Sequence, residues 1–265
     1  MNPTIRFFCI IPLILLAFGL RSQAPVIPEK KEVDHTTGAW LGIYTKYHFN
    51  DRWAYHGEYH ARMREGIKEM AQVYLRFGAT YRIQKYLDFT VGIVTPFYWN
   101  PNPERENTDN VVPQYRFWQQ AILATPFDHI KVFHQLRLEQ RWRRDYVQGA
   151  PFELTHRFRY KLTVYVPLNH RDFGPNTLFL ALYEEIFMQA GKTVVFNHFE
   201  DNRAFAGLGY NLDEKFQFQV GYMNSYRHNK APYKYQSRHI GRVSIIHHLD
   251  FHLTRQPKAR DIPIH

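Results

Sequence analysis

Cysteine is almost absent from this sequence. The single cysteine, Cys9, lies inside the N-terminal apolar run FFCIIPLILLAFGL. The chain beyond that run has no thiol, which excludes disulfide bonds and thiolate metal sites from it. An exported protein without disulfides must be held together by side-chain packing or by a surrounding membrane.

Long hydrophobic runs are also scarce. The N-terminal run is 14 residues long, follows Arg6 and precedes the segment RSQAP. A basic residue, a short apolar run and small residues near a cleavage point together indicate a secretory signal peptide. We expect it to cover residues 1–22, with cleavage after Ser22 or Ala24. An uncleaved anchor is the alternative, although the run is short for a transmembrane helix.

Acidic residues are the minority among the charges. The sequence has 34 Lys and Arg against 24 Asp and Glu, a net charge of +10, and without Arg6 and Arg21 this becomes +8. The basic residues are dispersed, and nucleic acids are scarce outside the cytoplasm, so we expect no nucleic-acid partner. The mean hydropathy of −0.48 resembles that of a soluble protein. Membrane β-barrels have such values too, because only alternate residues face lipid.

What the sequence does contain is a long alternation of apolar and polar residues. In AQVYLRFGATYRIQKYLDFTVGIVTPFYW, residues 71–99, the alternation runs on either side of a short break at Lys85 and Tyr86. A strand has a side-chain period of two, so this stretch predicts a β-hairpin with one apolar face.

The same alternation recurs along the chain and predicts eleven strands. They are expected near 38–49, 52–63, 70–84, 87–99, 114–125, 130–144, 152–166, 176–188, 202–212, 215–227 and 236–251. Most exceed the usual ~5–6 residues of soluble strands and suit a tilted membrane-spanning strand. Tight turns alternate with longer polar loops, and aromatic residues gather near strand ends, as in outer-membrane barrels.

We therefore predict an all-β protein: a single antiparallel up-and-down transmembrane β-barrel of about 10–12 strands with a polar, charged lumen. The barrel would occupy residues 37–252, after an N-terminal extension at 23–36 and before a C-terminal tail at 253–265. Eleven is an unexpected count, because bacterial barrels normally have an even number of strands. An extra strand near 25–36 or 191–199, or one strand divided wrongly, would restore parity.

Alternation alone does not decide which face meets lipid. A soluble periplasmic barrel binding a small apolar ligand would have the same pattern with its apolar side chains inside. Strand length, aromatic ends and turn segregation favour the membrane barrel. Gln119, His134 and His156 fall on the apolar face, which predicts bulges or positions at headgroup depth. In LALYEEIFM the phase stays open, since either choice places Glu184 or Glu185 outward.

Several stretches resemble the domain-of-unknown-function 2490 family of Gram-negative outer-membrane proteins. They are LRLEQRWRR (136–144), HRFRYKLTVYVPL (156–168) and FEDNRAFAGLGYNLDEKFQFQVGYMN (199–224). The opening GAWLGIYTKYHFNDRWAYHGEYHARM (38–63) is similar to that family's first hairpin. The resemblance covers most of the chain and implies a β-barrel in the outer membrane of a Gram-negative bacterium. It brings no activity with it and assigns no functional residue.

If the apolar face meets lipid, the polar face lines the interior. The charged cluster expected there consists of His56, Glu58, His60, Arg62, Arg76, Arg137, Glu139, Arg141, Arg143, Glu153, Arg157, Arg159 and Lys161. In a narrow bore such charges must pair or enclose water. The cluster is then either a plug of Arg–Glu ion pairs that stiffens the barrel, or a basic passage or cavity that favours a small anionic solute.

The spacing His56-x-Glu58-x-His60 also raises the question of a metal site. Residues two apart on a strand share a face, at about 7 Å spacing, and imidazole and carboxylate are ligands that a metal accepts. That spacing is wide for one ion and no further ligand is evident, so we expect an ion-paired row, no metal and no cofactor.

The sequence thus predicts an outer-membrane barrel of unknown specific activity, structural or acting as a narrow basic-lumen channel. Its expected partners are outer-membrane lipids and the barrel-assembly machinery. The alternative is a lipid-modifying enzyme of hydrolase or acyltransferase type. Serines are few, and Ser225 with His228 nearby is not a convincing catalytic pair. We therefore expect no enzyme.

A first prediction concerns localisation. The full-length chain, expressed in a Gram-negative host, should be recovered in outer membranes and migrate differently on a gel before and after boiling. A closed barrel resists detergent until heated, because every backbone polar group is paired around the sheet. Recovery in the soluble periplasm without a heat-dependent shift would mean that the apolar faces point inward.

Overall fold

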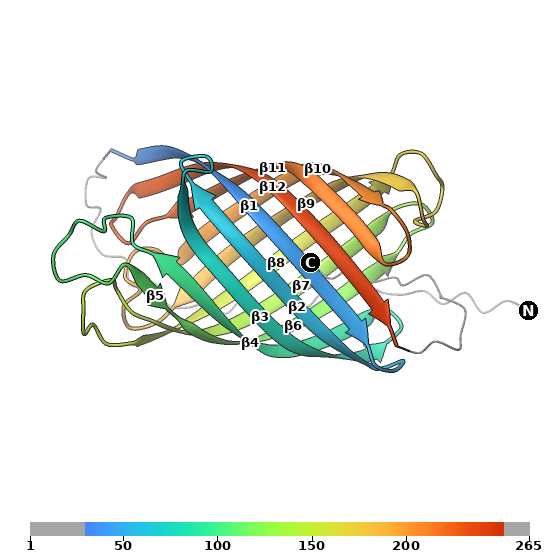
Figure 1. The fold of residues 1–265 in the computed structure, drawn as a ribbon, viewed down its shortest axis with the longest axis horizontal. Helices are drawn as coiled ribbons and strands as arrows, with labels where there is room; N and C mark the ends of the chain where they lie inside the picture. Colours follow the sequence, from blue (N-terminus) through green and yellow to red (C-terminus); the bar gives the residue numbers. More distant parts are fainter. Residues whose placement is uncertain (1–29, 252–265) are drawn as a thin grey trace, which may run out of the picture.

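The computed structural model describes residues 30–251, which form a barrel of β-strands (Figure 1). The strands are β1 (Glu32–His48), β2 (Trp53–Arg64), β3 (Glu69–Gln84), β4 (Leu87–Trp99), β5 (Val111–Pro113), β6 (Tyr115–Pro126), β7 (Lys131–Arg143), β8 (Glu153–Pro167), β9 (Thr177–Ala190), β10 (Phe199–Asn211), β11 (Phe216–His228) and β12 (Lys234–Asp250). Within this range no helix is long and apolar enough to cross a membrane. The expected signal peptide, residues 23–29 of the N-terminal extension and the C-terminal tail lie outside the described residues.

β5 and β6 are one strand of the barrel wall. Phe97 faces Pro113 and Val94 faces Arg116, so the register against β4 continues without a shift. Between them, the Gln114 amide donates to the Pro96 carbonyl (2.9 Å), but proline has no N–H to return the bond. The interruption is therefore a missing hydrogen bond in a continuous strand, and the wall has eleven strands.

The barrel closes through a parallel pair. Each strand is antiparallel to its sequence neighbours, whereas β1 and β12 run parallel from Glu32–Lys234 to His48–Asp250. An odd number of alternating strands leaves the first and last pointing the same way. The predicted all-β barrel of about 10–12 strands is confirmed with eleven strands, and this parallel pair is where it departs from a wholly antiparallel arrangement. Residues 191–198 form a loop, and the additional strand residues near the N-terminus extend β1.

The two ends of the barrel differ in their connections, as the sequence indicates. One end carries the short turns and Phe251, and the other carries the longer loops and Lys30 (Figure 1). At the short-turn end, the Asp213 side chain accepts hydrogen bonds from the amides of Lys215 and Phe216, both at 2.7 Å. These bonds lower the pKa of Asp213 from its usual value. Side-chain bonds of this kind stabilise a tight turn, so the two strands connect without a long loop.

At the other end, two long loops are joined to each other. The backbone of Thr108 forms a bridge with Val147, and the Asp109 amide donates to the Tyr146 carbonyl (2.7 Å). An ion pair between Arg144 and Asp109 (2.6 Å) adds a side-chain contact. The loop between β4 and β5 and the loop between β7 and β8 therefore form one cap segment, although they are far apart in sequence.

Side chains divide between the two faces of the wall as a membrane requires. Outward residues such as Ile93 (60 % exposed) and Val220 (58 %) are apolar, whereas inward residues such as Arg76 (4 %) and Glu139 (1 %) are charged. A soluble barrel would show the reverse arrangement, because water would solvate its outer face. The outer surface fits a lipid environment, and the soluble periplasmic alternative is incompatible with it.

Polar residues on the outer face are paired with cross-strand neighbours. Gln119 contacts Gln140 (3.0 Å), the His134 ring contacts the Tyr160 hydroxyl (2.8 Å), and the Asn202 amide donates to Glu184 (3.1 Å). In β9, whose inward and outward faces the sequence left undecided, Glu184 therefore points outward and Glu185 inward. No bulge is needed at Gln119, His134 or His156, because the registers of β6, β7 and β8 are regular there.

The lumen is not polar throughout, which corrects the sequence-based expectation. Near the short-turn end, four rings form an aromatic plug: Phe133, Tyr165, Phe173 and Phe179. Tyr165 lies 5.9 Å from Phe133 and 5.1 Å from Phe179, between ring centroids, and Phe173 reaches in from the loop after β8. A Cβ atom on Gly209 would lie 2.1 Å from the Phe179 ring, so glycine is required there.

The odd strand count predicts that the two ends of the described range, Lys30 and Phe251, lie on opposite sides of the membrane. Single cysteines at Lys31→Cys and Glu104→Cys should react with an impermeant maleimide on intact cells, because both lie at the end with the longer loops, which face the exterior in outer-membrane barrels. Asp213→Cys should react only after permeabilisation. The wild-type chain controls for background labelling. An even-stranded barrel would instead give Lys31→Cys the behaviour of Asp213→Cys.

Candidate functional site: the charged lumen

Strand alternation brings an unusual density of charge into the barrel. Within residues 30–251, nine cationic side chains and six carboxylates are buried. The cations are Lys46, Arg76, Arg116, Arg137, Arg141, Arg157, Arg159, Lys161 and Arg242, and the carboxylates are Glu58, Asp88, Glu139, Glu185, Glu200 and Asp201. Buried charges are stable only when they are paired and hydrogen-bonded, so the carboxylates determine the arrangement.

Glu58 on β2 is the first centre of this arrangement. Its carboxylate accepts from Arg137 on β7 (2.7 Å) and lies 3.2 Å from Arg76 Nε on β3. The imidazole Nε2 atoms of His56 and His60 lie 3.0 and 3.6 Å from the same carboxylate. The His-x-Glu-x-His row therefore surrounds one carboxylate that two arginines also contact. The described part of the chain contains no group of three His, Cys, Asp or Glu side chains placed to hold a metal.

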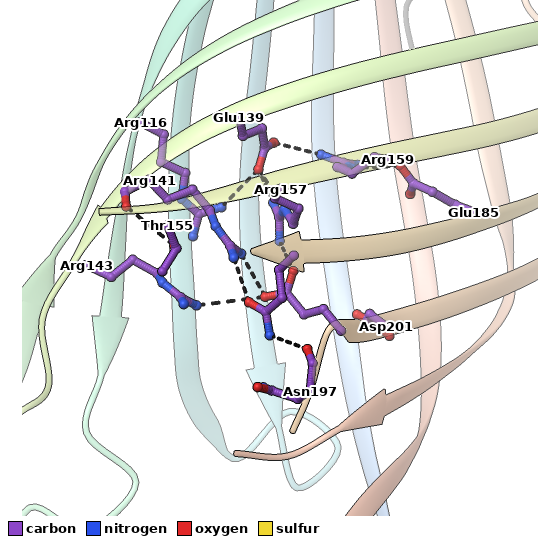
Figure 2. Close-up of polar contacts among 12 residues, drawn as sticks. Arg116, Glu139, Arg141, Arg143, Thr155, Arg157, Arg159, Glu185, Asn197 and Asp201 are labelled. Atoms are coloured by element: carbon purple, nitrogen blue, oxygen red, sulfur yellow. Dashed lines mark hydrogen bonds and ion pairs between the residues drawn. The ribbon is translucent and has the colours of Figure 1, made fainter. Parts of the chain in front are cut away.

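Glu139 on β7 is the second centre. It is ion-paired with four arginines: Arg157, Arg159 (3.0 Å), Arg76 (3.4 Å) and Arg116 (3.7 Å). Arg76 thus contacts both Glu58 and Glu139. Figure 2 shows Arg116, Arg157 and Arg159 approaching Glu139 from two sides. Charge-assisted bonds of this kind are roughly twice as strong as neutral ones, and several on one carboxylate fix the arginines in place.

These ion pairs cross the bore. β2 and β7 are not neighbours in the sheet, since β3, β4 and β6 lie between them. The Glu58–Arg137 bond therefore spans the interior, and a second crossing joins Lys46 on β1 to Asp88 on β4 (2.7 Å). These side chains join strands of the wall that share no backbone hydrogen bond.

A third centre forms at Glu200, nearer the longer loops. The register of β10 shifts between Phe199 and Asp201, and this bulge buries Glu200 and Asp201 although they are adjacent in sequence. Glu200 accepts from Arg141 (2.7 Å) and Arg157 (3.3 Å). Alternation alone would have placed one of the two acids outward.

The structure places most of the expected cluster inside the lumen. Buried or half-buried inward positions are occupied by His56, Glu58, His60, Arg62, Arg76, Arg137, Glu139, Arg141, Arg143, Arg157, Arg159 and Lys161. Glu153 is exposed at the first position of β8 and has no ion pair within the described range. Sequence reasoning missed Glu185, Glu200, Asp201 and Arg203. No sequence signal marks the bulge. The two adjacent glutamates of β9 left its inward and outward faces undecided.

The chain is similar to a protein-family model and to a solved structure. Residues 37–236 match the family model described as "Protein of unknown function (DUF2490)". The chain belongs to this family. Among solved structures, this DUF2490 barrel is similar to LpxR from Salmonella typhimurium, with 12 % sequence identity and a TM-score of 0.43, covering 76 % of this chain and 85 % of that one. No curated protein matches the chain.

In the DUF2490 barrel, the serine that the sequence offered as a possible nucleophile, Ser225, is held by structural partners. Ser225 is fully buried, donates to the Asp201 carboxylate (2.7 Å) and accepts from Arg238 (2.7 Å). His228 stacks on Tyr235, with ring centroids 4.5 Å apart. A nucleophilic serine requires a base within hydrogen-bond distance, and the recorded partners of Ser225 do not include a histidine.

We predict that Glu139 supports the whole network. Glu139→Gln should lower the free energy of unfolding by about 3–5 kcal/mol, because removing one partner leaves buried arginines uncompensated. Urea unfolding of the barrel in lipid vesicles, followed by tryptophan fluorescence, measures this change.

The matched control is Glu69→Gln, which removes one partner of the exposed Arg64–Glu69 pair (2.7 Å). Its effect should be about 0–1 kcal/mol. Equal effects of the two substitutions would show that the interior carboxylate contributes no more than a rim charge.

Proposed function

We propose that the protein is an integral barrel of the outer membrane of a Gram-negative bacterium, closed to the passage of solutes from one end to the other, with an interior whose ion pairs hold the wall in shape. Its apolar outer face, its long loops at one end and short turns at the other, and the secretory signal indicated by the sequence support this location. Outer-membrane lipids and the barrel-assembly machinery are then its partners.

The single observation that carries the closed state is the Glu58–Arg137 bond across the bore. An open channel needs a continuous aqueous path, which in porins is provided by 16–18 strands. Here ion pairs cross the middle of a barrel of eleven strands, and the aromatic plug fills the lumen near the short-turn end. An apolar constriction excludes water and therefore ions. The proposal includes no catalytic step.

Planar-bilayer recordings of the purified barrel test this proposal. The wild-type protein should show no steady conductance. The triple variant Glu58→Ala/Arg137→Ala/Phe173→Ala, which removes one crossing bond and one ring of the plug, should conduct. A gel shift on heating establishes that each variant is folded.

The double variant Arg64→Ala/Glu69→Ala removes an ion pair at the rim and should remain silent, which controls for loss of charge as such. Steady anion-selective conductance of the wild-type barrel would contradict the closed state and favour the narrow channel that the basic composition also suggested.

A further inference from the structure

A small chamber remains in the middle of the lumen, between the crossing ion pairs and the aromatic side chains. It has a volume of about 60 Å³. That space corresponds to roughly four to six water molecules, or to one small tetrahedral oxyanion. The chamber lies among charged groups from strands on opposite sides of the barrel, including Arg76 on β3, Lys161 on β8 and Arg242 on β12.

The lining of the chamber is strongly cationic. Eight basic side chains border it, against two carboxylates, Glu58 and Glu185. Two of these cations, Arg62 and Arg242, have no ion pair with a carboxylate within residues 30–251, and Lys161 lies opposite Glu185 of β9 in the strand register without a direct ion pair. The Arg62 guanidinium lies 3.8 Å from the Trp40 ring centroid, and the Lys161 ammonium lies 4.3 Å from that of Tyr183. Ring faces attract these cations but do not neutralise them.

Two guanidinium groups also have unused donors at the chamber. Arg76 (4 % exposed) and Arg242 (6 %) each have a buried Nη1 atom without a hydrogen-bond acceptor in the described structure. The Nη2 atom of Arg242 donates to the Tyr44 hydroxyl (2.7 Å). A buried donor left unsatisfied is costly, and most such groups in proteins have a partner. The chamber therefore combines excess positive charge with donors that need an acceptor.

We propose that this chamber is a binding site for a phosphate-type oxyanion, either free inorganic phosphate or the phosphate of a lipid headgroup. A tetrahedral dianion offers acceptor oxygens in several directions at once, which matches arginines that come from different strands. Guanidinium forks are suited to phosphate oxygens. The aromatic plug closes the short-turn end, so the anion enters from the end with the longer loops.

Isothermal titration calorimetry of the refolded full-length barrel with inorganic phosphate, at constant ionic strength set by chloride, tests the site. The wild-type protein should bind phosphate with one site per chain. Arg242→Gln should weaken binding about tenfold or more, since it removes a charge-assisted bond to the anion. Glu185→Gln should bind more tightly, because it removes one of the two negative charges of the lining. A folding defect cannot produce tighter binding.

Arg64→Gln, at the barrel rim, is the matched control and should bind phosphate as the wild type does. Absence of phosphate binding by the wild type, or an unchanged Kd in both Arg242→Gln and Glu185→Gln, would overturn the proposal. The source of the anion follows from a second preparation, extracted from outer membranes without unfolding. If this preparation binds phosphate only after unfolding and refolding have removed a co-purified phosphorylated lipid, the occupant is a headgroup. Equal binding by both preparations identifies free phosphate.

Discussion

The neutralisation of buried arginines by a few shared carboxylates is the constraint on which this barrel depends. Glu58 and Glu139 both contact Arg76, so the two largest groups of ion pairs form one network across the lumen. Burying a charge without a partner costs several kcal/mol even after relaxation. The six buried carboxylates therefore fix the positions of the arginines, and through them the relative positions of strands that share no backbone hydrogen bond.

The parallel seam is a second constraint with wide consequences. Once the chain forms eleven strands, closure requires β1 and β12 to run in the same direction. Parallel pairing is slightly less stable per residue than antiparallel pairing, and the seam here compensates by its length, since all 17 residues of β1 have a partner on β12. Side chains reinforce it: Arg242 on β12 donates to Tyr44 on β1. Because the strand count is odd, the two ends of the described range lie at opposite ends of the barrel.

Much of the fold could be predicted from the sequence, because alternation is a local signal. It located every long strand, assigned Arg76 and Glu139 to the interior, and separated short turns from long loops. The pairing of those charges could not be read in this way. Glu58 and Arg137 are 79 positions apart, and only the closed sheet determines that they meet. The bulge before Asp201 depends on backbone geometry that leaves no compositional mark.

The aromatic plug is another feature that the alternation of the sequence does not predict. An inward phenylalanine such as Phe133 follows the lumen phase of its strand, yet its neighbours Tyr165 and Phe179 come from other strands, and Phe173 comes from a loop. Period-two reasoning classifies a face by its majority, and it therefore assigned the whole lumen to charge. In fact aromatic rings fill part of the lumen near the short turns, where the Lys46–Asp88 ion pair also lies.

Aromatic side chains among the charges explain how the lumen can hold more cations than carboxylates. Basic side chains that form no direct ion pair with a carboxylate rest on rings: Arg62 on Trp40, and Lys161 on Tyr183. A cation over a ring gains electrostatic attraction without losing its charge, whereas an added carboxylate would cancel it. The aromatic residues thus retain positive charge in a space from which most water is excluded, where electrostatic interactions are strong. A lumen built only to be closed would gain more from full neutralisation, and the surplus charge around Arg76 and Arg242 is therefore best understood as a feature of binding.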